Sequence, residues 1–498
     1  MLELRSAGIL LHLTSLPSAH GIGGLGPEAY EFADFLEQTG QRIWQILPLT
    51  PTSLSTHNDP YHSISAFAGN PLLISLEFLL EAGWLTPEDI AAPPIFPEDS
   101  VDFAAVTAWK EPLLNKAFNA FEPDDEPDFQ RFCTRNHHWL DDYALFSALR
   151  QRYANMPWTS WPEPLRDRNP EALVRAGLDL GEEIQRAKFL QWVFDNQWES
   201  LRAYCAKRRI SLFGDMPIYV DMESADLWAN PNLWKLDEDL KPTVVAGVPP
   251  DYFSATGQLW ESPIYDWDEH EKEEFKWWLR RIHRNLDLFD FLRIDHFRGL
   301  IAFWEVPAGE STAMNGEWVE APVCKFLDTL YASRPSLPLI AEDLGVITPD
   351  VRETMRAYNL PGMKILLFAF GDDLPTNPYA PHNIEPFSLV YTGTHDNNPV
   401  QAWYDEEADA ETRDRLVQYI GHSLNSEDLH WALIRMALGS PARLAVIPVQ
   451  DLLGLGAEAR MNRPGNLKGN WHWRMKDGSL TPEICERLRE LTRLYGRE

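Results

Sequence analysis

Short apolar runs recur along the whole chain, and each of them stops at residues that are typical of loops. Within the runs, apolar residues follow one another directly instead of alternating with polar ones. Continuous apolar runs of this length are typical of parallel strands that are buried on both faces. The sequence therefore predicts eight parallel strands, at residues 8–16, 42–49, 210–220, 288–297, 337–345, 363–370, 387–396 and 443–453.

Helical periodicity occupies the connections between these runs. After the first run, Pro27 can take the first position of a helix, an apolar face follows at helical spacing, and Gly40 ends the segment. After the fifth run, Thr348 and Pro349 begin a second helix of the same kind. Strands that alternate with helices predict an α/β fold, and eight such units predict a (β/α)8 TIM barrel.

Two connections are much too long for ordinary crossover helices. We therefore expect one barrel over residues 1–498 that carries inserted subdomains at about 52–207 and about 222–286. Apolar stripes at helical spacing indicate that the first insertion is mainly helical. The second contains a segment rich in Gly, Pro and aromatic residues, 247–267, which has neither a helical nor a strand period. We interpret this segment as a functional loop, with a simple packing loop as the alternative.

Composition narrows the possible partners and compartments. Lys and Arg number 44 against 75 Asp and Glu, and the net charge of -31 argues against nucleic acid or membrane surfaces as partners. No apolar run reaches the roughly 20 residues of a membrane-spanning helix. The four cysteines are scattered and form no CxxC pair, which argues against a zinc site and a disulfide scaffold and predicts a cytoplasmic protein.

Acidic residues stand where several of the predicted strands stop. Three runs end on or beside Asp295, Glu342 and Asp396, and a fourth contains Asp215. The carboxyl ends of barrel strands carry the active site. A buried carboxylate costs several kcal/mol unless it is paired or used, so these acids favour one shared site over separate salt bridges.

Converging carboxyl groups suit reactions at glycosidic bonds, where one acid attacks carbon and another donates a proton. A metal site is the main chemical alternative, but the chain has no HxH, HExxH or DxDxDG pattern, and we expect no metal. Gly21, Gly23 and Gly26 match GxGxxG, yet the next strand ends in Pro48 and Leu49 instead of an acid. We therefore expect no dinucleotide and no other cofactor.

An ordered set of motifs spans nearly the whole chain. It includes LTSLPSAHGIGGLG, DPYHSISAFAGNPLLISLE, GDMPIYV, GVPPDYFSATGQLW, RIDHFRG, AEDLG, PGMKILLFAF, YTGTHDNN and MNRPGNLKGNWHWR. In these motifs the chain resembles the 4-α-glucanotransferases called amylomaltases or disproportionating enzymes, which form glycoside hydrolase family 77 and are related to the α-amylases.

The resemblance implies a retaining transfer between α-1,4-glucans and glucose. Asp295 would be the nucleophile, Glu342 the general acid and base, and Asp396 the transition-state stabiliser. It implies no metal, no cofactor and no obligate protein partner. Substrate-binding roles would fall to Arg293, which would also ionise Asp295, and to His395, Asp215, Tyr61, Tyr252, Phe253, Trp260 and Asn462.

Some positions depart from the pattern of this family. The loop PTSLSTHNDPY is long, GQLWESP replaces GQxWGNP, and Leu367 and Pro399 stand where Gln and Thr are usual. These departures bear on the acceptor and the chain-length range rather than on the carboxylates. Two alternatives stay open at this point: a retaining α-1,4-glucan hydrolase that uses water as the acceptor, and a catalytically silent glucan-binding protein.

Overall fold

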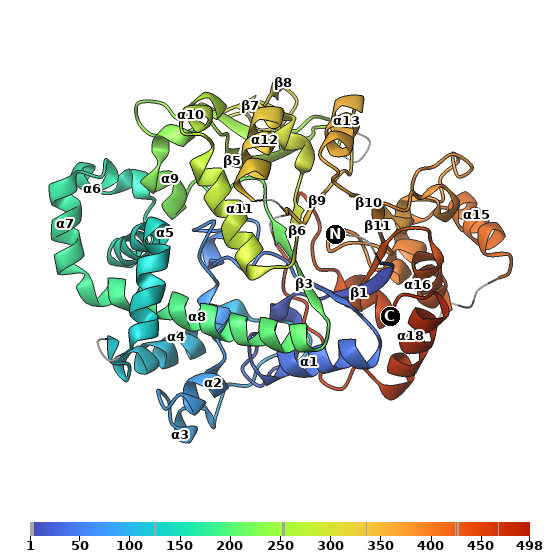
Figure 1. Cartoon of the computed structure of the whole chain (residues 1–498), viewed down its shortest axis with the longest axis horizontal. Helices are drawn as coiled ribbons and strands as arrows, with labels where there is room; N and C mark the ends of the chain where they lie inside the picture. The colour runs from blue at the N-terminus through green and yellow to red at the C-terminus, as the bar shows by residue number, and fades with distance from the viewer. Residues whose placement is uncertain are drawn as a thin grey trace.

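Eight parallel strands form a nearly closed barrel in the computed structural model (Figure 1). The structure describes residues 4–123, 126–250, 254–334, 336–423, 425, 428–466 and 468–498. The sheet order is β10-β11-β12-β1-β2-β3-β6-β9, and the amide of Ala341 donates to the carbonyl of Pro361 at 3.0 Å across the remaining gap. Each predicted run overlaps one barrel strand, although β1 and β10 begin before their runs, and this confirms the barrel. The strands are β1 (Ser6–Leu10), β2 (Ile43–Gln45), β3 (Ser211–Met216), β6 (Phe291–Ile294), β9 (Leu339–Ala341), β10 (Gly362–Ile365), β11 (Ser388–Tyr391) and β12 (Leu444–Pro448).

Helices cover the outside of the barrel and begin where the sequence predicts. Helix α1 (Pro27–Gln38) has its proline in the first turn, and α13 (Pro349–Ala357) begins directly after Thr348. Both bury one apolar face against the barrel, as their periodicity predicts. The later helices are α12 (Val323–Ser333), α14 (Val400–Ala402), α15 (Ala410–Ile420), α16 (Leu429–Gly439), α17 (Val449–Leu452) and α18 (Pro482–Leu494).

The long connection between β2 and β3 is mainly helical. Its last helix returns beside α1 and leads directly into β3, so this helix serves as the crossover of the second barrel unit (Figure 1). The helices are α2 (Leu76–Glu81), α3 (Pro87–Ile90), α4 (Phe103–Asn119), α5 (Pro127–Arg152), α6 (Glu163–Arg166), α7 (Pro170–Asp179) and α8 (Gly181–Lys207).

A second, antiparallel sheet lies outside the barrel, and the sequence did not predict it. Its order is β5 (Gln258–Pro263), β4 (Val244–Val248), β7 (Ala302–Pro307) and β8 (Glu317–Glu320). Strands β4 and β5 take up residues 247–248 and 258–263, so the interpretation of the whole segment 247–267 as a loop is wrong. The pairing of β4 with β5 shifts register between Val245 and Gly247, and such a bulge breaks the alternation that marks a strand. Three helices complete this region: α9 (Ala225–Ala229), α10 (Trp267–Lys272) and α11 (Lys276–Leu288).

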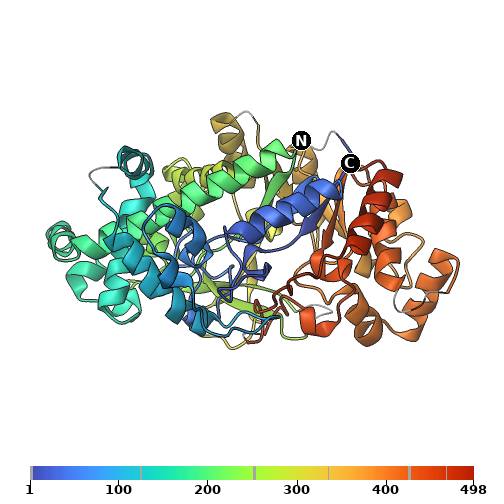
Figure 2. The same cartoon turned by 90° about the horizontal axis from the view of Figure 1, so that it is seen from below.

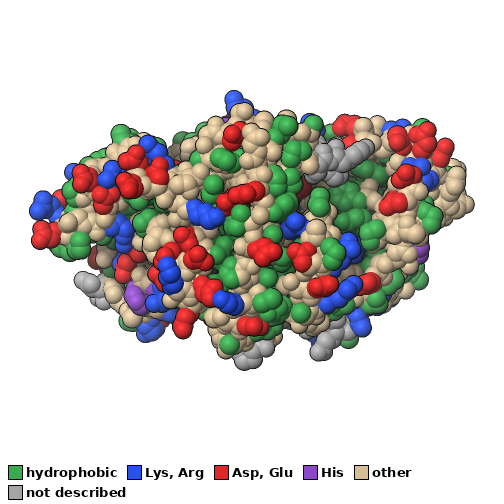
Figure 3. All heavy atoms as spheres, turned by 90° about the horizontal axis from the view of Figure 1, so that it is seen from above, with side chains coloured by type: hydrophobic (Ala, Val, Ile, Leu, Met, Phe, Trp, Pro, Cys, Tyr) green, Lys and Arg blue, Asp and Glu red, His purple; other side chains and the backbone are tan. Residues whose placement is uncertain are grey.

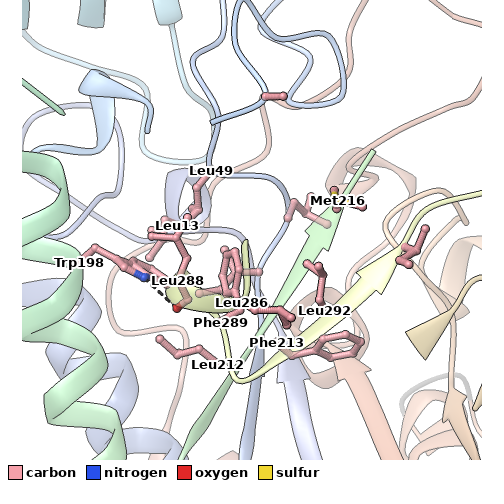
Figure 4. Packing of buried hydrophobic residues seen from close by; sticks show 14 of the residues in the cluster. Leu13, Leu49, Trp198, Leu212, Phe213, Met216, Leu286, Leu288, Phe289 and Leu292 are labelled. Atoms are coloured by element: carbon pink, nitrogen blue, oxygen red, sulfur yellow. Dashed lines mark hydrogen bonds between the residues drawn. The ribbon is translucent and has the colours of Figure 1, made fainter. Parts of the chain in front are cut away.

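Buried apolar side chains hold the barrel strands against their helices (Figure 4). Trp198 of α8 meets Phe289 edge to face at 5.4 Å between ring centroids, and its indole nitrogen donates to the carbonyl of Leu288 at 3.0 Å. Leu212 and Phe213 of β3 are fully buried in the same cluster. This packing fixes the strands relative to one another, so the residues that follow their carboxyl ends are held at defined positions.

The two ends of the described chain lie side by side (Figure 2). The fully buried Arg497 donates to the carbonyl oxygens of Ser6 at 2.9 Å and of Leu438 at 2.6 Å, which ties the end of the chain to β1. Acidic and basic side chains are interspersed on the face that Figure 3 shows. Within the described residues, no helix is both long and apolar enough to cross a membrane.

Candidate active site

The three carboxylates singled out in the sequence follow strands of one sheet. Asp295 comes directly after β6, Glu342 comes directly after the neighbouring strand β9, and Asp396 lies on the loop that follows β11. The amide of Asp295 donates to Met216 at 3.0 Å, and that of Glu342 donates to Ile294 at 3.1 Å. The sheet hydrogen bonds therefore continue past the strand ends and hold both acids at the same edge.

Arg293 links two of the acids from inside the barrel. It lies directly beside Asp215 in the register of β3 and β6. One of its terminal nitrogens, Nη1, is 2.7 Å from both oxygens of Asp215, and the other, Nη2, is 2.9 Å from Oδ1 of Asp295. Arg293 and Asp215 are buried, and Asp295 keeps about a quarter of its side chain exposed. One guanidinium therefore balances two carboxylates where water has little access.

Burial and the position of Arg293 together decide which acid holds a proton. Burial raises the pKa of Glu342 to about 7. This rise is opposed by the charge of Arg293 and by the amides of His296 and Leu344, which donate to the two oxygens of Glu342 at 2.7 and 3.0 Å. Burial and the neighbouring carboxylates also raise the pKa of Asp295, and the charge of Arg293 opposes that rise. Because the guanidinium contacts Asp295 directly, the negative charge is best placed on Asp295 and the proton on Glu342.

Tyr61 joins the first long insertion to this site. Its hydroxyl donates to Oδ2 of Asp215 at 2.8 Å, so it accepts from Nε2 of His395, which lies 2.9 Å away. The same Nε2 is 3.4 Å from Oδ1 of Asp396. Burial lowers the pKa of His395, so the ring is neutral and can act as a hydrogen-bond donor to a carboxylate or a hydroxyl.

Asn462 and Arg460 hold the loop that carries Asp396. The side-chain amide of Asn462 donates to Oδ1 of Asp396 at 2.7 Å, and its backbone amide donates to the carbonyl of His395 at 3.0 Å. Arg460 donates to the carbonyl oxygens of Asp396 at 2.7 Å and of Asn462 at 2.8 Å. Arg460 was missed in the sequence because it lies just outside the motif MNRPGNLKGNWHWR.

Trp471 was also missed, although this motif contains it. Its ring lies 5.6 Å from that of Tyr61 and 5.9 Å from that of His395, between centroids. Its backbone adopts a left-handed conformation with φ of 67°, which is costly for a bulky residue and often occurs at functional sites. The signal in the sequence was the density of aromatic residues in NWHWR.

Trp260, on β5, lies over the end of β6. Its ring meets His296 edge to face at 4.8 Å and lies 6.2 Å from Tyr219. The small antiparallel sheet therefore places an aromatic side chain beside the residue that follows Asp295. Tyr252 and Phe253, which were predicted to cover a bound chain together with Trp260, lie outside the described residues.

The structure thus brings three acids together. Asp295 is a carboxylate paired with an arginine, Glu342 is a buried carboxyl group that keeps its proton near neutrality, and Asp396 is a partly exposed carboxylate. This combination can attack a carbon centre and protonate a leaving oxygen in the same pocket. In the part of the chain that the structure describes, no three His, Cys, Asp or Glu side chains are grouped in a way that could hold a metal ion.

Comparisons with known proteins agree with this chemistry. The family described as 4-alpha-glucanotransferase matches residues 11–481. The 4-alpha-glucanotransferase of Aquifex aeolicus (strain VF5) is 48% identical over 495 residues, which cover 99% of this chain and 100% of that protein. The enzyme of the same name from Thermus thermophilus is 47% identical over 497 residues and 98% of each chain. The structure of an amylomaltase from Streptococcus agalactiae in complex with acarbose is similar, with a TM-score of 0.95, 37% identity and 99% coverage of both chains. The chain therefore belongs to the 4-alpha-glucanotransferase family.

Proposed function

We propose that this enzyme transfers a segment of an α-1,4-glucan to the 4-hydroxyl of glucose or of another α-1,4-glucan by a retaining double displacement. Asp295 attacks the anomeric carbon while Glu342 gives its proton to the leaving oxygen, which produces a covalent glycosyl-enzyme. Glu342 then takes the proton of the acceptor hydroxyl as that oxygen displaces Asp295. The observation that carries this proposal is the contact of Arg293 with Asp295 beside a Glu342 whose pKa is raised to about 7.

The surrounding residues are assigned to substrate binding. Asp396, held by Asn462 and His395, would accept sugar hydroxyls and stabilise the positive charge that develops on the ring in the transition state. Tyr61 and Asp215 line the donor side of the same network. Trp260 would cover the bound glucan, together with Tyr252 and Phe253, because aromatic rings pack well on the apolar faces of sugars.

Incubation with maltotriose tests the proposal. A ladder of longer maltooligosaccharides together with glucose is the expected product, and new linkages should have the α configuration by proton NMR. Asp295→Asn should abolish the ladder. Asp290→Asn is a matched control, because Asp290 lies just before β6, at the opposite end of the same strand, and pairs with Arg202 at 2.9 Å. Glucose and maltose without elongation would instead show the hydrolase.

The other expectations are tested separately. Full activity in excess EDTA would agree with a reaction that needs no divalent ion, whereas loss of activity restored by a metal would contradict the proposal in this form. The absence of an obligate protein partner and the cytoplasmic location stay predictions. Purification of the active enzyme as a single species and fractionation of cells address them.

A further inference from the structure

A second cavity lies outside the catalytic centre. It is lined by residues of α5, α9 and α11 and by the segment around Phe67, and it has a volume of about 160 Å³. Helices α5 and α9 lie next to each other, with α11 on the side toward the barrel (Figure 1). Since one water molecule takes about 30 Å³ of liquid volume, the cavity has room for roughly five waters or for one hexose ring.

The floor of the cavity is aromatic and rigid. The ring of Phe67 is nearly parallel to that of Trp139 at 6.2 Å and meets that of Trp277 edge to face at 6.1 Å. Both indole nitrogens already have partners: Trp139 donates to Asn136 at 3.2 Å and Trp277 donates to Asp226 at 3.1 Å. The three rings therefore present carbon atoms, rather than unsatisfied polar atoms, to whatever enters the cavity.

The rim of the cavity is polar and has no excess of positive charge. Asp142, Asp226 and Glu273 contribute three acids, and Lys276 and Arg280 contribute two bases. Within the described part of the chain, the side chains of Glu273, Lys276 and Arg280 have no hydrogen-bond or ion-pair partner, so their donors and acceptors are available to a ligand. A phosphate or carboxylate ligand would need an excess of positive charge, which this rim does not provide.

We propose that this cavity binds one glucosyl unit, either a free sugar or the end of a glucan chain, as a site separate from the catalytic centre. A hexose suits it because the CH groups of the ring can pack on the aromatic floor while its hydroxyls bond to the charged rim. The inference rests on the proposed function in one respect, since the Glu342→Gln background of its test is inactive because Glu342 is the proposed acid and base.

One segment of the chain lies between the cavity and the catalytic centre and contacts both. Ser65 and Phe67 line both this cavity and a void of about 30 Å³ that reaches Tyr61 and Asp215. A sugar bound in the cavity therefore contacts the segment that carries Tyr61.

The test counts how many sugar sites are lost when the cavity is filled. Equilibrium dialysis with labelled maltose is done in a Glu342→Gln background, in which the sugar is not consumed, and the donor and acceptor sites of the catalytic centre are the same in every variant of that background. Ala229→Trp, which fills the cavity from α9, should remove one site per chain relative to the background. Arg280→Ala should weaken that one site by roughly tenfold, because a hydrogen bond to a charged group is lost. Arg175→Ala, a change of an exposed arginine on α7, should leave every site unchanged.

Several outcomes would overturn the inference. They are a number and affinity of maltose sites that stay unchanged in both Ala229→Trp and Arg280→Ala, and sugar density only at the catalytic carboxylates in crystals soaked with maltose. Binding of inorganic phosphate but not of maltose at the cavity would show an anion site instead. Failure of the proposed function is a different result, since it is the absence of a maltooligosaccharide ladder from the wild-type enzyme.

Discussion

Replacement of Arg293 by methionine removes the charge that balances the buried Asp215 and the partly exposed Asp295. The guanidinium and the carboxylate of Asp295 have an N–O distance of 2.9 Å, so their charge centres are roughly 4 Å apart. At an effective dielectric constant near 20, this attraction is about 4 kcal/mol, or about three pKa units. The pKa of Asp295, which burial already raises, should therefore rise further in Arg293→Met, and the nucleophile should be protonated near neutral pH.

The expected result is a loss of kcat at pH 6 that follows the ionised fraction of Asp295 and recedes as the pH rises; an attraction of about 4 kcal/mol limits this loss to roughly a thousandfold. The assay is the initial rate of glucose release from maltotriose between pH 5 and pH 9. Asp215 also loses its partner, and a broken buried pair costs about 3–5 kcal/mol of stability, so rates should be measured well below the melting temperature of the variant. Arg293→Lys, which keeps a positive charge, should recover part of the activity.

A matched control comes from the same motif. Arg298 is also mostly buried, but its Nη1 donates to the carbonyl of Val346 at 2.9 Å and to the hydroxyl of Thr348 at 2.8 Å, not to a carboxylate. Arg298→Met should therefore keep most of the activity. If Arg293→Met is folded by circular dichroism and loses less than about tenfold in kcat, the ionisation of Asp295 does not depend on Arg293, and the electrostatic argument is refuted.

Three further predictions concern the proton and the hydrogen bonds of the site. Glu342, whose pKa is raised to about 7, must be protonated to act as the acid. Above about pH 7, kcat should therefore fall about tenfold per pH unit. A flat profile of kcat to pH 9 would contradict this role. The stabilisation that protonated Glu342 contributes is lost as pH rises from its ordinary pKa of 4.5 through 7. Relative to wild type, Glu342→Gln should therefore gain on the order of 3 kcal/mol in free energy of unfolding between pH 4 and pH 8, as measured in urea titrations. Equal pH dependence of the two proteins would disprove the buried proton. Tyr61→Phe removes hydrogen bonds of 2.8 and 2.9 Å and should lower kcat/KM roughly ten- to a hundredfold, whereas Tyr30→Phe on α1 should not; equal effects would indicate a general loss of packing.

Local pattern in the sequence was enough to predict the barrel and its main acids. Each strand is a continuous apolar run because both of its faces are buried, and Pro27 and Thr348 mark helix starts through their own backbone and capping chemistry. Asp295 and Glu342 stand out because each directly follows such a run. These signals depend on neighbours in the chain, so they can be seen without the fold.

The tertiary structure alone decided how distant segments meet. Tyr61 and His395 are 334 residues apart and share a hydrogen bond, and β4 pairs with β7 although the barrel strand β6 lies between them in the chain. The cavity between α5, α9 and α11 exists only because two insertions pack together. The raised pKa of Glu342 likewise comes from burial by the whole barrel. The sequence therefore determined which acids stand at the strand ends, and the packing of remote segments determined which of them is charged, because burial and long-range contacts leave no local periodic signal.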